Sequence, residues 1–131
     1  MEESATFSHT IPDRLDALPE LRSALRAWLA DVGIETSTAE DVVLAAWEVC
    51  ANAVEHPIER KGAGVTLGAE ATALGVRVAV HDTGSWREDR TPRPGRGLGL
   101  RLARAMMDRI SVVSGRVGTE VVMWRFTGGH A

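Results

Sequence analysis

The chain begins with residues of alternating polarity and continues with apolar residues spaced three and four positions apart. Residues 7–11 alternate as expected for a short strand, which Pro12 ends. Apolar residues then recur with a helical period, at Leu15, Leu18, Leu21, Leu25, Trp28, Leu29 and Val32. This pattern predicts a helix that begins near Pro19, because proline is tolerated in a first turn, and that ends at Gly33.

A second helix is predicted to follow. Ser37 and Thr38 are both candidates for its N-cap, since each has an acidic residue three positions later, as in a capping box. Apolar residues continue to about His56, and Pro57 follows directly. Because proline cannot continue a helix, we expect this one to end sharply there.

The remainder of the chain predicts one further helix and four strands. The strands are expected at 65–71, 75–82, 110–115 and 119–126, and the helix at 97–110. The second strand has valine at every other position, at Val76, Val78 and Val80, which indicates one buried face. Residues 83–96 are rich in glycine, proline and arginine and predict a loop. These elements favour an α+β fold of two layers, with helices on one face of a mostly antiparallel sheet.

The composition and length of the chain indicate one globular domain. It has 131 residues, of which 44% are hydrophobic and 25% charged, so we expect one domain over 1–131. Cys50 is the single cysteine, which excludes an internal disulfide and favours a reducing compartment. No apolar run is long enough to span a membrane, and the first residues do not resemble a signal peptide. We therefore expect a cytoplasmic protein or a domain taken from one.

The charge of the chain is slightly negative but unevenly distributed. The net charge of −3 gives no reason to expect direct binding to nucleic acid. Four arginines fall in the predicted loop, at Arg87, Arg90, Arg93 and Arg96. This loop is interpreted either as a solvated segment or as a lid that binds anions. Lys61 is the sole lysine and is followed by glycine, which excludes a P-loop.

The second predicted helix carries a polar stripe among apolar residues. Glu48 and Asn52 are four residues apart and project from the same side, and Glu55 or His56 extends the stripe. An acid and an amide bordered by apolar residues are costly to bury unless they bind something. The stripe either faces solvent or lines a binding site.

Two further features carry candidate chemistry. Asp82 ends an apolar strand and is followed by Thr83 and Gly84. Asp82 either forms a turn or accepts a hydrogen bond from an amino group of a ligand. Gly95, Gly97 and Gly99 precede a predicted helix, where free backbone amides bind phosphate. Each feature alone is weakly specific.

The order of these features resembles the GHKL-type ATP-binding fold of histidine kinases and gyrase B. The resemblance runs from Phe7 to Phe126, and the stretches "EVCANAVEH" and "GRGLGL" resemble the RsbW and SpoIIAB group of anti-sigma-factor serine kinases. It implies a two-layer ATP-binding domain of the Bergerat type. It also implies a homodimer that uses ATP and Mg²⁺.

The resemblance assigns roles to individual residues. Glu48 matches the general base that acts on a substrate serine, and Asn52 matches the residue that holds Mg²⁺. Asp82 matches the aspartate that reads the adenine amino group. Gly84 matches the glycine that lets the ring approach, and Thr119 matches a threonine near the adenine end.

The phosphate turn of the family matches Gly95, Gly97, Leu98 and Gly99. Arg93 and Arg96 are the candidate arginines of the lid. Trp86 departs from the family pattern, because many relatives have a second glycine there. His56 is expected to cap or pack, and Cys50 to lie in the core.

The resemblance favours an ATP-dependent serine kinase. It implies that the chain phosphorylates an anti-anti-sigma protein of the STAS type and sequesters a sigma factor. The alternative is a nucleotide-binding regulatory module without kinase activity, taken from a longer signalling protein that contains a phosphatase. A scaffold without any ligand is the third interpretation.

Overall fold

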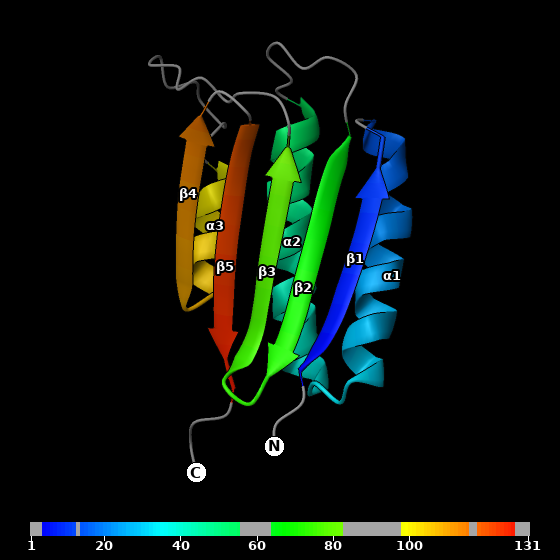
Figure 1. The fold of residues 1–131 in the computed structure, drawn as a ribbon, viewed down its shortest axis with the longest axis vertical. Helices are drawn as coiled ribbons and strands as arrows, with labels where there is room; N and C mark the ends of the chain where they lie inside the picture. Colours follow the sequence, from blue (N-terminus) through cyan, green and yellow to red (C-terminus); the bar gives the residue numbers. More distant parts are fainter. Residues whose placement is uncertain (1–3, 13, 56–63, 83–97, 116–117, 128–131) are drawn as a thin grey trace.

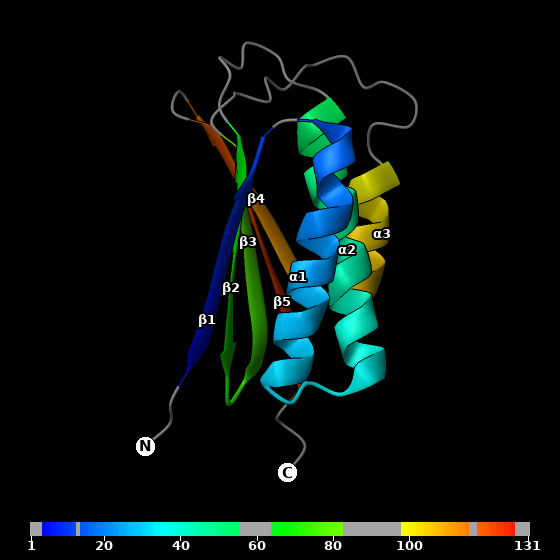
Figure 2. The ribbon, with the colours of Figure 1, turned by 90° about the vertical axis from the view of Figure 1, so that its right-hand side faces the viewer.

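The protein is a two-layer α+β domain in which helices cover one face of an antiparallel sheet (Figures 1 and 2). The computed structural model describes residues 4–12, 14–55, 64–82, 98–115 and 118–127. The elements of these residues are β1 (Ala5–Ile11), η1 (Leu15–Ala17), α1 (Leu18–Asp31), α2 (Thr36–Glu55), β2 (Val65–Thr72), β3 (Gly75–Asp82), α3 (Leu98–Met106), β4 (Arg109–Gly115) and β5 (Gly118–Phe126). The predicted fold class is confirmed. Among the described helices, none combines the length and the apolarity needed to cross a bilayer.

The sheet has the strand order β1-β2-β3-β5-β4, and each neighbouring pair is antiparallel. β5 therefore lies between β3 and β4, although it follows both in the chain. Residues directly opposite each other share one face of a sheet. Val80 lies opposite Leu67 on one side and Val121 on the other, and all three are buried beneath the helices.

The helix-side face of the sheet and the inner faces of α1 and α2 form the core. The predicted alternation in β3 is confirmed, because Val76, Val78 and Val80 are each at most 2% exposed. The buried residues of α1 recur at helical spacing, at Leu18, Leu21, Leu25 and Leu29. α2 contributes Val42, Ala46, Val49, Cys50 and Ala53 to the same core. The expectation that Cys50 is a core residue is therefore confirmed.

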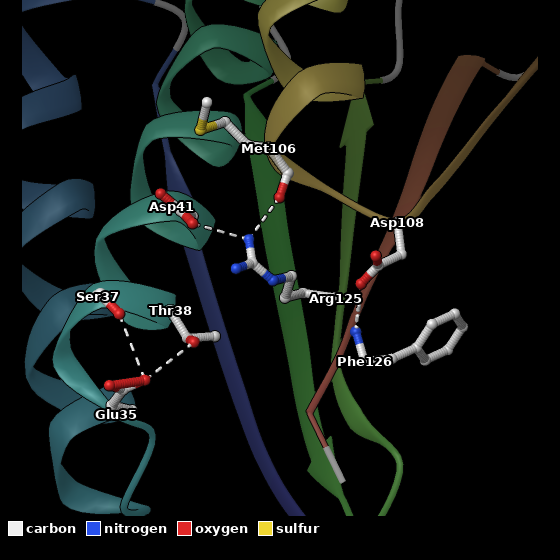
Figure 3. Close-up of polar contacts among 8 residues, drawn as sticks. All are labelled: Glu35, Ser37, Thr38, Asp41, Met106, Asp108, Arg125 and Phe126. Atoms are coloured by element: carbon white, nitrogen blue, oxygen red, sulfur yellow. Dashed lines mark hydrogen bonds and ion pairs between the residues drawn. The ribbon is translucent and has the colours of Figure 1, made fainter. Parts of the chain in front are cut away.

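The predicted ends of α1 are confirmed, but the predicted start of α2 is wrong. α1 has Pro19 in its first turn, and Gly33 follows it with a φ of 86°. The first backbone bond of α2 runs from the Ala39 amide to the Glu35 carbonyl, so neither Ser37 nor Thr38 is the N-cap. Both hydroxyls donate instead to the Glu35 carboxylate, at 3.3 and 3.5 Å (Figure 3).

The helix expected at 97–110 is shorter than predicted. α3 ends at Met106, and β4 already begins at Arg109. The physical reason is pairing with β5, because Arg109 lies opposite Trp124 and Ile110 lies opposite Met123. Ile110 thereby packs against the core. The four predicted strands are confirmed within one or two residues at each end.

Candidate functional site

Two buried polar residues meet at one edge of the sheet. Asp82 ends β3, and Thr119, near the start of β5, is its partner in the ladder. Each is 1% exposed, and they are the buried polar residues of the described part of the chain. A buried carboxylate is costly unless it has a partner, which sets Asp82 apart from an ordinary solvated turn residue.

The polar stripe of α2 lies at the border of the core. Glu48 and Asn52 are half-buried, whereas Val49 and Ala53, the residues that follow each of them, are fully buried. The stripe is therefore neither wholly solvated nor packed inside. The third residue of the stripe, Glu55 or His56, stays a prediction, because His56 and the side chain of Glu55 lie outside the described residues.

Glu48 also lines an open hollow between α1 and α2. The hollow encloses about 390 Å³ and includes Arg22, Arg26 and Trp47 in its walls. The Arg22 guanidinium lies 4.4 Å from the centre of the Trp47 ring, a cation–π contact. A molecule in this hollow has direct access to the Glu48 carboxylate.

A charged pair stands further along the same hollow. Arg26 donates two hydrogen bonds to Glu40, at 2.9 and 3.1 Å. These bonds raise the pKa of Arg26 and lower the pKa of Glu40. Both side chains are almost half exposed, so solvent screens the pair and it adds little stability.

The candidate residues come from elements that converge at one end of the domain. α2 and α3 run antiparallel and pack together, so the first residues of α3 lie beside the second half of α2 (Figure 2). β3 ends and β5 begins toward the same end (Figure 1). Leu98 and Gly99 form the start of α3 there.

Several predicted site residues lie outside the described residues. They are Gly84, Trp86, Arg93, Gly95, Arg96 and Gly97. The structure therefore brings together Asp82 and Thr119 in one ladder, and Glu48 and Asn52 on one helix. The predicted lid and most of the phosphate turn stay predictions.

Comparison with known proteins identifies the family. Residues 11–125 match the histidine kinase-like ATPase domain, which is most of the chain. The chain belongs to this family. Membership in this histidine kinase-like ATPase family implies nucleotide binding.

Two solved structures are similar to this histidine kinase-like domain. The RsbU and RsbW domains of Rv1364c from Mycobacterium tuberculosis match with a TM-score of 0.73 and 29% identity, over 93% of this chain and 32% of that one. The histidine kinase domain of the blue-light activated histidine kinase EL346 from Erythrobacter litoralis matches with a TM-score of 0.58 and 26% identity, over 86% and 60%. The chain thus spans about a third of the first relative and three fifths of the second.

One well-connected residue of this ATPase domain was missed by sequence reasoning. Arg125 lies on the helix side of β5, and its Nη1 donates to the Met106 carbonyl at 2.6 Å. The same nitrogen lies 2.9 Å from a carboxylate oxygen of Asp41 on α2 (Figure 3). The signal was present, since strand alternation places Arg125 on the same face as Val121 and Met123.

Proposed function

We propose that this domain is an ATP-dependent protein serine kinase. It phosphorylates an anti-anti-sigma protein of the STAS type and sequesters a sigma factor when that partner is modified. The observation that carries the proposal is the position of Glu48, one helical turn from Asn52 and open to the hollow between α1 and α2. A protein hydroxyl entering by this hollow would reach Glu48 beside the proposed nucleotide site.

The residues fit a site for Mg·ATP. Asp82 would accept a hydrogen bond from the adenine amino group, with Thr119 beside it. Gly84 would let the ring approach, and the start of α3 would offer backbone amides to the phosphates. Arg93 and Arg96 would close over them as part of the lid.

Asn52 would hold Mg²⁺ through its amide oxygen. The described residues contain no cluster of three His, Cys, Asp or Glu that could bind a metal ion. Mg²⁺ at a nucleotide needs no such cluster, since phosphate oxygens and water supply most of its ligands. When bound, the ion neutralises charge on the phosphates.

The proposed reaction transfers one phosphoryl group. The serine Oγ forms a bond to the γ-phosphorus while the bond between that phosphorus and the β–γ bridging oxygen breaks, and ADP leaves. Glu48 takes the proton from the serine hydroxyl. General-base catalysis of this kind contributes roughly 10²–10⁴-fold in rate.

The test compares Glu48→Gln with wild type, using labelled ATP and the purified STAS protein of the same organism. We expect phosphorylation to slow strongly while ATP binds as well or slightly better, because a negative charge near the phosphates is removed. Glu70→Gln, on the uncovered face of β2, is the matched control and should phosphorylate normally. Transfer at the wild-type rate by Glu48→Gln would show that Glu48 is not the base.

The second candidate is a nucleotide-binding regulatory module without kinase activity. The relative from Mycobacterium tuberculosis favours it, because RsbU and RsbW domains share one chain there. This candidate predicts that wild type binds ATP and its partner but transfers no phosphate. A homodimer is expected for either candidate, and light scattering in solution tests it.

A further inference from the structure

Three elements of the domain meet at a single arginine nitrogen. Arg125 projects from β5 toward the helices, and its Nη1 donates to the Met106 carbonyl, at the last residue of α3. The same Nη1 lies 2.9 Å from Oδ2 of Asp41 in α2 (Figure 3). The end of α3 is thus fixed to both the sheet and the neighbouring helix.

The contact suits the physical chemistry of a helix end. The last carbonyl groups of a helix have no partner within it, and a cation there also complements the helix dipole. α3 has only nine residues, and a helix of this length is marginal without tertiary contacts. Arg125 and Asp41 are 25% and 38% exposed, so solvent screens their attraction only in part.

Asp108, two residues after the end of α3, links this end of the helix to β5 by two further hydrogen bonds. Its amide donates to the Trp124 carbonyl at 2.8 Å, and its carboxylate accepts from the Phe126 amide at 2.7 Å (Figure 3). These contacts flank Arg125 on both sides along β5. Together they restrict the direction of α3 as well as its position.

The other end of α3 carries Leu98 and Gly99, the last residues of the predicted phosphate turn. Eight residue steps separate Leu98 from Met106, which is about 12 Å at 1.5 Å per residue. A tilt of about 5° at the fixed end would move the first turn by about 1 Å. Productive sites tolerate displacements of about 0.5 Å, so small changes at Arg125 matter at the phosphates.

We propose that Arg125 is a positioning residue for phosphate binding. Through Met106 and Asp41 it sets the direction of α3, and thereby the placement of the first-turn amides relative to Asn52. This inference rests on the proposed function, in which the start of α3 receives the phosphates of ATP. Arg125 itself lies at the far end of α3, away from the proposed phosphate site.

The experiment measures ATP and adenosine affinity by calorimetry in wild type and Arg125→Met. Methionine keeps most of the apolar stem and removes the cation. We expect ATP to bind about five- to tenfold more weakly, which is less than the loss of a direct charged hydrogen bond because Arg125 acts only through α3, and adenosine to change less than about twofold. Arg125→Lys should bind ATP nearly as wild type does, because one nitrogen makes both contacts.

Two further variants make the result decisive. Arg77→Met removes an arginine from the uncovered face of β3, opposite Trp124, and should alter neither affinity. Asp41→Asn keeps the bond from Arg125 to Met106. It should weaken the binding of ATP but not of adenosine, and by less than Arg125→Met does. This variant preserves the test if Arg125→Met does not fold. Equal losses for ATP and adenosine, or no loss, would overturn the inference. A wild type that binds both ligands equally would instead overturn the phosphate site itself.

Discussion

Replacing Asp82 by asparagine tests the adenine end of the proposed site. The substitution keeps the side-chain volume at a position that is 1% exposed, so it opens no cavity. It removes the negative charge that would accept a hydrogen bond from the adenine amino group. A hydrogen bond to a charged group contributes about 1.5–3 kcal/mol, which corresponds to ATP binding about 10- to 150-fold more weakly.

Calorimetry with two nucleotides separates this effect from a general loss of binding. Inosine triphosphate carries an oxygen in place of the adenine amino group, so wild type should strongly prefer ATP. Asp82→Asn should narrow that preference. Glu120→Gln is the matched control, because Glu120 lies on the uncovered face of β5 opposite His81. Unchanged ATP affinity in Asp82→Asn, or an equal loss for both nucleotides, would refute the assignment.

Two other predictions concern the metal and the buried thiol. Asn52→Ala should abolish most of the gain in ATP affinity that Mg²⁺ provides while metal-free binding persists; equal losses with and without Mg²⁺ would contradict the metal role. Burial raises the pKa of the Cys50 thiol from 9.0 to about 12, so the native protein should react with Ellman's reagent only on unfolding. The thiol of the unfolded chain ionises at a lower pH than the buried thiol does. The contribution of Cys50 to the free energy of unfolding should therefore be complete below pH 9 and decline as the pH rises from 9 toward 12. Urea titrations of wild type and Cys50→Ala over this pH range measure the decline.

Local chemistry was sufficient to predict most of the fold. Proline fixes its own φ, and glycine readily adopts the positive φ found after a helix end, which is why Pro19 and Gly33 marked the ends of α1 correctly. The alternation of Val76, Val78 and Val80 likewise reflects a period of two that only a strand buries on one face. Neither inference depended on residues distant in the chain.

The errors arose where distant residues compete for local partners. Glu40 and Asp41 were the acids expected to complete a capping box, but Arg26 of α1 and Arg125 of β5 bind them instead. The end of α3 was misplaced because β5 pairs with 109–115, a contact that no local pattern shows.

The sequence supplied the candidate site residues one by one but not their arrangement. The resemblance named Asp82 and Thr119 separately, and only the position of β5 next to β3 makes them neighbours. Arg125 was overlooked because its role depends on the Met106 carbonyl, a backbone group without a sequence signature.

The central claim is that ATP binds where α2, α3 and the ends of β3 and β5 converge. Amide chemical shifts recorded during a titration with Mg·ATP test it most directly, because they locate the ligand without any substitution. We predict that the largest changes occur at Asn52, Asp82, Gly99 and Thr119, with little change near Leu74 at the opposite end of the sheet. Changes confined to the uncovered face of the sheet, or no changes at saturating nucleotide, would contradict the account.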